Sequence, residues 1–418
     1  MGNQWKGYAT LKEEQNASLK KLVSFAYDNV PYYHRLFKEL NLKPEDVRTV
    51  DDLQKLPILT KAIIKRNWDD LRPMNLRDIR YVDKATGGST GTPLEYRMSK
   101  RDQRMSVCLL YRGWSYAGYH LSDRVVFMGG SSLMPGAKSS ATRRMHEILK
   151  NIRMLSSFDM SEAAMEDYAR EINKAAPKYL FGYASSIYHF SSWLEKNGKG
   201  IHRPDGIFTT AEKLFPKARK TIEETFMCPV YDTYGLNDGG VSAFECSEKT
   251  GFHIDTERAI LEVVDKDARQ LEKGEGLILA TSLHNYAMPF IRYDTGDVGV
   301  LSDEVCPCGR GYRLLKEIKG REQEMLITPE GMAIHGEFFT HIFWDVRNVK
   351  EFQVVQDKKD HLTIKIVPEP DFDKRELENV RALIAKRSPA WNVDFDITTS
   401  IDRTKAGKYR FVISEIIP

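Results

Sequence analysis

Apolar residues close to the N-terminus recur at the spacing of an amphipathic helix, which leaves one face of the segment hydrophobic. This pattern covers residues 16–42 and is interrupted at Pro31. Proline has no backbone N–H to donate and its ring clashes with the preceding turn, so it ends a continuous helix. The segment therefore predicts two helices joined by a turn.

From residue 81 to about residue 300, short β-rich runs alternate with longer amphipathic stretches. The predicted strands cover residues 124–128, 179–181, 206–210, 229–231, 260–264 and 277–281. The predicted helices cover residues 185–196 and 161–175, the latter with Ser161 as N-cap and Pro177 beyond its end. This alternation is typical of an α/β fold.

The pattern changes after residue 321. Strands are predicted over residues 349–356, 362–367 and 393–397, a helix over residues 372–386, and a basic tail follows. A segment of this size suits a small α+β domain. We therefore predict a large N-terminal domain over residues 1–322 and a C-terminal domain over residues 323–418.

Composition narrows the class of protein. Of the 418 residues, 41% are hydrophobic and 29% are charged, which is ordinary for a soluble globular chain. The net charge of +3 and the lack of long like-charge runs argue against a nucleic-acid partner. No apolar stretch of membrane-spanning length and no apolar signal core occur, so we expect a cytoplasmic protein without a membrane partner. A homodimer stays open.

One loop carries the strongest chemical signal. Residues 87–92 read GGSTGT, so backbone N–H groups and hydroxyls are uncovered and an oxyanion can approach the main chain closely. No lysine follows Gly91, which argues against a P-loop NTPase. The loop predicts a phosphate cradle; the alternative is a solvated turn.

Three further segments follow this loop in order, at residues 231–240, 292–297 and 318–326. Together the four resemble the core motifs of the adenylate-forming superfamily of acyl-CoA synthetases, peptide-synthetase adenylation domains and luciferases. Residues 29–33 and 51–61 resemble the opening of phenylacetate-CoA ligases and their capsule-biosynthesis relatives. The resemblance implies a large α/β domain with mixed sheets and flanking helices, plus a small mobile α+β lid.

The resemblance also implies a reaction, in which ATP and Mg²⁺ serve to activate an organic acid, expected to be aryl, as an acyl-adenylate that passes to CoA. It assigns the grip on the β- and γ-phosphates to Ser89, Thr90, Gly91 and Thr92, and the adenine edge to Ala211 and Glu212. A surface pair of Glu212 with Lys213 is the alternative at that edge. The lysine that often follows the loop in the family is Leu94 here, so charge neutralisation must come from elsewhere.

The remaining nucleotide contacts are implied in the same way. Tyr234 would stack on adenine, with Asp232 and Gly235 beside it in the same segment. Asn237 would reach the α-phosphate and Asp238 would bind Mg²⁺, in positions where the family has Thr and Glu. These assignments come from the segment at residues 231–240, for which a strand ending in a glycine turn is the alternative.

Three charged residues complete the implied site. Asp297 would accept from the ribose hydroxyls and Arg321 would lie near the ribose and phosphates. Lys408, after Gly407, would reach the α-phosphate and the carboxylate during adenylation; a solvated basic tail is the alternative. The hinge position of the family, usually Asp, is Gln323 here.

Cysteine and histidine form a second constellation. Cys246 and His253 flank a turn, and Cys306 and Cys308 follow further along the chain. Three thiolates and one imidazole suit a closed, tetrahedral and therefore structural Zn²⁺ site, whereas inert core thiols are the alternative. The other two cysteines, Cys108 and Cys228, are interpreted as core residues, and no disulfide framework is expected.

The acid itself cannot be read from the sequence. Four aromatic residues either line an acyl pocket or belong to the core: Phe158, Phe181, Tyr183 and Tyr188. Two other functions stay open beside a CoA ligase. One passes the acyl or AMP group to an amine or hydroxyl, and the other is a non-catalytic nucleotide-binding scaffold.

Overall fold

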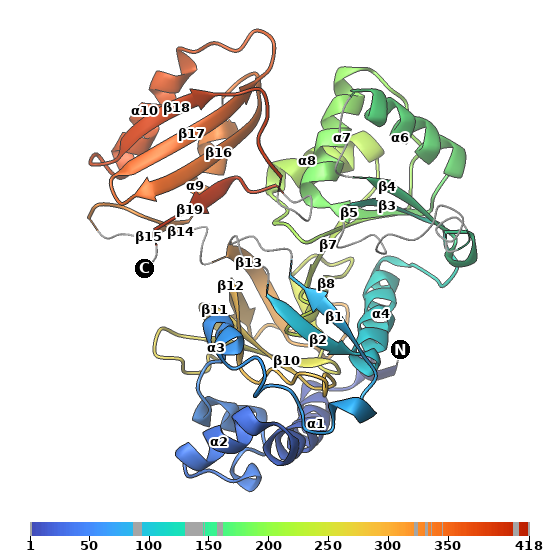
Figure 1. Cartoon of the computed structure of the whole chain (residues 1–418). Helices are drawn as coiled ribbons and strands as arrows, with labels where there is room; N and C mark the ends of the chain where they lie inside the picture. Colours follow the sequence, from blue (N-terminus) through green and yellow to red (C-terminus); the bar gives the residue numbers. More distant parts are fainter. Residues whose placement is uncertain are drawn as a thin grey trace. The chain divides into compact units, whose positions relative to one another are not determined.

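The computed structural model describes residues 2–86, 94–129, 145, 147–156, 162–321, 325–330, 333–335, 337–344, 346–403 and 409–416 (Figure 1). The chain divides into two compact units, Met1–Lys319 and Gly320–Pro418. Of the helices in the described residues, none has both the length and the hydropathy that a bilayer-spanning segment requires.

The N-terminal helices follow the predicted pattern. Helix α1 covers Tyr8–Asn29 and α2 covers Pro31–Glu39, so Pro31 begins the second helix, where a missing N–H costs nothing. The buried face of α1 includes Leu19, Leu22 and Val23, which are fully buried in the largest core cluster of the first unit. Helix α1 begins earlier than the apolar periodicity alone indicated.

An 11-stranded mixed sheet forms the centre of the first unit, in the order β10-β11-β12-β13-β9-β8-β7-β6-β5-β3-β4. The parallel block comprises β3 (Val125–Gly129), β4 (Ile152–Ser156), β5 (Tyr179–Tyr183), β6 (Gly206–Thr210) and β7 (Val230–Gly235). The other strands are β8 (Ser242–Glu245), β9 (Phe252–Ile254), β10 (Ala259–Val264), β11 (Gly274–Ser282), β12 (Tyr293–Ser302) and β13 (Leu314–Arg321). Each predicted strand exists, within a few residues at its ends.

Helices cover the parallel block as expected for βαβ connections. They are α6 (Glu162–Ala175), α7 (Ala184–Lys196) and α8 (Pro216–Phe226), and Figure 1 shows them beside β3, β5 and β4. The apolar faces of these helices and strands share one buried cluster, which includes Ile172, Phe190 and Ile222. The sequence predicted α6 and α7 but not α8. Ser161, the predicted N-cap of α6, lies outside the described residues.

A hairpin frames the glycine-rich loop. Strands β1 (Tyr81–Ala85) and β2 (Glu95–Ser99) pair antiparallel, with Ala85 opposite Glu95. At this closed end, the backbone N–H of Thr86 donates to the carbonyl of Leu94 at 2.9 Å. At the open end β2 leads directly into α4 (Lys100–Trp114). The hairpin therefore joins the ends of residues 87–93, which lie outside the described part of the chain.

The second unit has its own sheet and core. The sheet order is β18-β17-β16-β19, from β18 (Asn392–Ile397), β17 (His361–Pro368), β16 (Val349–Lys358) and β19 (Val412–Ser414). Helices α9 (Glu337–Trp344) and α10 (Glu376–Arg387) share its apolar cluster, and β14 (Met325–Ile327) pairs with β15 (Ala333–His335). The first unit also contains α3 (Lys61–Arg66) and short 3-10 helices.

Two predictions for this unit are wrong in detail. The helix predicted from residue 372 begins at Glu376, because the Asp373 carboxylate accepts from the Arg375 backbone N–H in a turn before it. The predicted basic tail contains β19, which pairs parallel with β16. A three-residue strand is too short to show a period of two in the sequence.

Candidate functional site

A tight loop follows β7 and carries Asn237 and Asp238. The N–H of Leu236 donates to the carbonyl of Val241 at 2.9 Å, which closes the loop. A Cβ on Gly239 would lie 2.7 Å from the Cβ of Ala280, and Gly240 has a φ of +75°. Only glycine fits both positions, so the loop backbone packs directly on β11.

Two segments of the predicted nucleotide site meet beside this loop. The Tyr234 hydroxyl donates to Asp297 Oδ2 at 2.9 Å, which joins β7 to β12. Asp297 is buried, and its backbone N–H donates to Thr295 Oγ1. Burial and the adjacent carboxylate both raise the pKa of Tyr234, so the phenol stays protonated and remains a donor.

The second contact holds the predicted magnesium ligand. The Tyr293 hydroxyl donates to Asp238 Oδ2 at 2.8 Å, and Asp238 is only 7% exposed. Burial, followed by the charge of Asp238, raises the pKa of Tyr293. Among the described residues Asp238 has no cationic partner and no other hydrogen bond. Its carboxylate thus keeps acceptor capacity for a hard cation.

A saturated ion pair lies behind the same loop. Arg258 donates from Nε to Asp102 Oδ1 at 3.0 Å and from Nη2 to Asp102 Oδ2 at 2.8 Å. Both side chains are buried, and the carbonyl of Asn237 lies 3.5 Å from Arg258 Nη2. This bidentate geometry neutralises Asp102, which fits a structural role. The Asn237 residue itself is exposed.

Asp232 and Glu212 contact protein groups. Asp232 Oδ1 accepts from Thr209 Oγ1 at 2.6 Å, and burial, with a contribution from Glu245, raises the pKa of Asp232 to about 7. Glu212 Oε2 accepts from the N–H of Ser185 at 2.9 Å, which caps the first turn of α7. Ala211 is exposed with a φ of +68°.

Several predicted site residues cannot be placed. Ser89, Thr90, Gly91, Thr92, Gln323 and Lys408 lie outside the described residues, as does Phe158. Arg321 is the last residue of β13, and only its backbone is described. Leu94, at the position of the family lysine, is 2% exposed and belongs to the core.

The cysteine and histidine side chains do come together. The donor atoms of Cys246, His253, Cys306 and Cys308 all lie within 4.8 Å of one another. Cys246 Sγ is 3.6 Å from Cys306 Sγ, and His253 Nε2 is 3.3 Å from Cys308 Sγ. A tetrahedral Zn²⁺ with bonds of about 2.0–2.3 Å needs ligand atoms about 3.3–3.8 Å apart. The residues therefore fit such an ion.

Local structure explains how this cluster forms. Similar turns follow two of the thiols, with N–H to O=C bonds from Lys249 to Cys246 and from Gly309 to Cys306, each 3.1 Å. The rings of Tyr116 and Tyr312 stand edge-on to the His253 imidazole. The turns and the rings orient the donors before any ion binds.

The structure shows the burial of several other residues that the sequence singled out. Cys108 is exposed on α4, so its assignment to the core is wrong. The sequence pattern around Cys108 did not indicate which face of the helix is buried. Cys228 is buried, as predicted. Phe181 packs in an aromatic cluster with Trp114 and Phe127, and Tyr188 packs against another core cluster; Tyr183 is fully buried.

Sequence reasoning missed three residues of this site. They are Tyr293, Arg258 and Asp102, which hold the loop or its carboxylate. Tyr293 stands inside the motif at residues 292–297, so its position was visible although its contact was not. The pairing of Asp102 with Arg258 spans distant parts of the chain and has no local signal.

The chain is similar in sequence to one family model and to several known proteins. Residues 326–415 match the family model described as the CapK C-terminal domain. Protein CapK of Staphylococcus aureus is 25% identical over 413 residues, 97% of this chain and 90% of that protein. Phenylacetate-coenzyme A ligase of Thermus thermophilus is 28% identical over 335 residues, 76% of this chain and 72% of that protein.

Solved structures share the fold. A 2-hydroxyisobutyryl-CoA ligase in the postadenylation state superposes with a TM-score of 0.79 at 18% identity, covering 99% of this chain and 91% of the other. An anthranilate CoA ligase in complex with anthranoyl-AMP gives 0.55 at 15% identity, over 78% and 65%. The predicted resemblance and the predicted fold class are confirmed.

Proposed function

We propose that this chain is an ATP-dependent, AMP-forming ligase that joins an organic acid to CoA through an acyl-adenylate. The observation that carries the proposal is the contact of Tyr234 with Asp297, beside the loop of Asp238, because it unites the separate segments that the reaction needs. The relatives named as phenylacetate-coenzyme A ligases support CoA as the acceptor.

The reaction has two steps, and neither forms a covalent bond between the substrate and the protein. In the first, a carboxylate oxygen of the acid attacks the α-phosphorus of ATP and pyrophosphate leaves. In the second, the CoA thiol attacks the acyl carbonyl, its proton is lost and AMP leaves. Both steps depend on positioning and on electrostatic stabilisation of the phosphates.

The described residues suggest a division of labour. Tyr234, Gly235 and Ala211 would border the adenine, while Asp297 would accept from the ribose. Asp238 would hold Mg²⁺ through the oxygen that Tyr293 leaves available, and Mg²⁺ supplies charge neutralisation to the phosphates. Asn237 is exposed at the tip of the loop, where its amide can donate to a phosphate oxygen.

Other roles rest on sequence motifs alone. Residues 89–92 would grip the β- and γ-phosphates, Arg321 would lie near the ribose, and Lys408 would stabilise the charge that develops between the carboxylate and the α-phosphate. Glu212 and Asp232 are engaged by Ser185 and Thr209, so we assign them to shaping the site beside the nucleotide.

We also propose that the cluster of Cys246, His253, Cys306 and Cys308 holds a structural Zn²⁺. The cluster supplies four donors and leaves no open position for catalysis. An ion there would fasten the β8–β9 turn to the loop between β12 and β13. The zinc would thus support strands in the middle of the large sheet without entering the reaction.

The experiment that tests the ligase proposal is exchange of pyrophosphate into ATP, measured over a panel of organic acids with and without CoA. Acid-dependent exchange together with thioester formation would support it. Acid-dependent exchange without thioester formation would favour an amine or hydroxyl acceptor. A protein that binds ATP but gives no exchange with any acid would favour the non-catalytic scaffold.

A further inference from the structure

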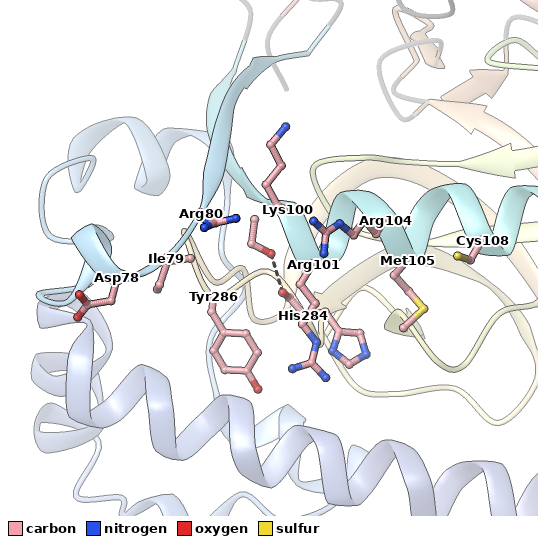
Figure 2. Close-up of a pocket in the computed structure, with 11 residues that line it drawn as sticks. Asp78, Ile79, Arg80, Lys100, Arg101, Arg104, Met105, Cys108, His284 and Tyr286 are labelled. Carbon is pink, nitrogen blue, oxygen red and sulfur yellow. Dashed lines mark hydrogen bonds between the residues drawn. The ribbon is translucent and has the colours of Figure 1, made fainter. Parts of the chain in front are cut away.

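A basic cleft lies at the open end of the β1–β2 hairpin. Its volume is ≈ 610 Å³, which is in the usual range for small-molecule sites. Figure 2 shows side chains from the end of the hairpin, from the first turns of α4 and from the loop of His284 and Tyr286 around it. None of these residues has a part in the function proposed above.

Four cationic side chains line this cleft: Arg80, Lys100, Arg101 and Arg104. Asp78 is the one carboxylate among the lining residues. Within the described part of the chain, neither Arg80, Arg101 nor Arg104 forms an ion pair or a side-chain hydrogen bond. No described residue neutralises these three guanidinium charges, and a cleft with such positive charge concentrates anions.

The arrangement of these charges opposes the stability of α4. Lys100, Arg101 and Arg104 stand at the N-terminus of α4, where the helix dipole favours anions. Lys100 and Arg104 are also like charges four residues apart on one helix face. Asp102, the one acid of this first turn, is committed to Arg258. Charges that destabilise a helix and have no compensating contact in the structure are typical of a functional site.

The remaining wall suits an organic group. Tyr286, Ile79 and Met105 line the cleft beside the cations. The Tyr286 ring is fixed edge-on to Phe25, with 4.8 Å between ring centroids, so it offers a rigid surface. His284 contacts the carbonyl of Glu257 through Nε2 at 2.8 Å, and burial lowers the pKa of His284. A ligand here would meet both cations and apolar surface.

The cleft is distinct from the predicted phosphate loop. Tyr81 pairs with Ser99 at one end of the hairpin and Ala85 with Glu95 at the other. Four steps of about 3.3 Å separate these pairs, or about 13 Å along the strands. The glycine-rich loop leaves the hairpin at the end opposite the cleft.

We infer that this cleft binds the phosphorylated end of an organic ligand, through the guanidinium groups of Arg80, Arg101 and Arg104. Guanidinium groups form bidentate bonds with phosphate oxygens, and the apolar wall would hold the attached organic part. The ligand has two sources of the same chemistry: the nucleotide end of CoA, which rests on the proposed function, or a separate phosphorylated metabolite.

Calorimetric titration with adenosine 3′,5′-bisphosphate tests the site without requiring ligase activity. The test protein is the double variant Arg101→Ala with Arg104→Ala, because both residues are exposed on α4. The charge-matched control is Arg66→Ala with Arg72→Ala, which are exposed and do not line the cleft. We expect at least tenfold weaker binding for the test variant than for the parent or the control. Equal affinity in all three proteins would overturn the inference.

Enzyme kinetics then separate the two sources. If the ligand is CoA, the test variant should raise the KM for CoA at least tenfold while acid-dependent pyrophosphate exchange stays at the parent rate. If the ligand is a separate metabolite, the KM for CoA should stay unchanged while bisphosphate binding weakens. Absence of exchange in the parent would argue against the proposed function and would leave the calorimetric result standing.

Discussion

Asp102 and Asp238 are two buried aspartates on either side of one loop, and they are held in opposite ways. Burial raises the pKa of Tyr96, and the charges of Asp238 and Asp102 both add to this shift, so both lie close to the same phenol. Asp102 is neutralised by the bidentate guanidinium of Arg258, whereas Asp238 receives one phenolic hydrogen bond from Tyr293. A carboxylate with a guanidinium partner supports the fold, whereas one that accepts only from a phenol keeps acceptor capacity for a ligand.

The strongest test of this comparison breaks the neutralised pair. Asp102→Ala would leave the Arg258 charge buried and unpaired, so we expect the free energy of unfolding to fall by about 3–5 kcal/mol. Chemical denaturation measures this loss. The exposed pair of Lys273 and Asp303 supplies the control, since Asp303→Ala should leave the same quantity almost unchanged. Equal losses in both variants would contradict a structural role for Asp102.

Lys408 is the protein cation that is predicted at the α-phosphate and the carboxylate of the acid during adenylation. Lys408→Ala should slow acyl-adenylate formation by roughly 10²- to 10³-fold, about 2.7–4 kcal/mol, with little change in ATP affinity. Single-turnover assays of each half-reaction measure this. Presynthesised acyl-adenylate should restore most of the turnover to CoA; an equal loss in both steps would contradict the role.

Zinc removal tests whether the cluster of Cys246, His253, Cys306 and Cys308 stabilises the first unit. Elemental analysis should find one Zn²⁺ per chain, and Cys306→Ser should lose the ion and lower the Tm by about 3 °C or more. The exposed thiol gives the control, because Cys108→Ser should keep both the ion and the Tm. Freshly purified protein without zinc would end this proposal.

Asp238→Asn tests the second aspartate of the comparison, the predicted Mg²⁺ ligand. The amide keeps the size of the side chain and an oxygen that can accept from Tyr293, so the free energy of unfolding should change by less than about 1.5 kcal/mol. The Mg²⁺ concentration for half-maximal exchange should rise about tenfold or more, equivalent to about 1.4 kcal/mol. An unchanged Mg²⁺ requirement would remove Asp238 from the metal site.

The smallest effect is expected where a charged pair is exposed. In the second unit, the Nδ1 and Nε2 atoms of His361 lie 2.6 Å from Asp357 and 3.1 Å from Asp394, and these hydrogen bonds raise the pKa of His361. The folded state then binds the proton more tightly, so the stabilisation is present below about pH 6.5 and is lost as the pH rises through the raised pKa. His361→Gln should remove a pH-dependent difference of a few tenths of a kcal/mol, measured by denaturation at pH 5 and pH 9. The same pH dependence in parent and variant would contradict this.

The sequence predicted those elements whose buried faces are apolar. The α1–α2 pair was visible because the buried Leu19, Leu22 and Val23 repeat at helical spacing and Pro31 separates the helices. Helix α4 was not predicted, because Asp102 and Arg112 lie on its buried side and hide the hydrophobic period. Charge pairing replaced apolar packing there, and its partners stand far away in the chain.

The candidate site shows the same limit. The four residues of the cysteine and histidine cluster could be named from residue type alone, since thiolates and imidazole are typical metal ligands. The contacts of Tyr234 and Tyr293 could not be predicted, because they depend on how β7 and β12 are placed in the sheet. Residue identity indicates chemistry, whereas a partner in space needs the fold.

The packing of Gly239 and Gly240 on β11 has a consequence for directed evolution. A library that randomises these positions would return almost only glycine, because Ala280 leaves no room at the first and the φ of +75° disfavours other residues at the second. Leu236 and Asn237 are half-buried and exposed, so variants there should keep the loop backbone. Of these two codons, the one for Leu236 can carry the diversity, because Asn237 has the predicted contact with the α-phosphate.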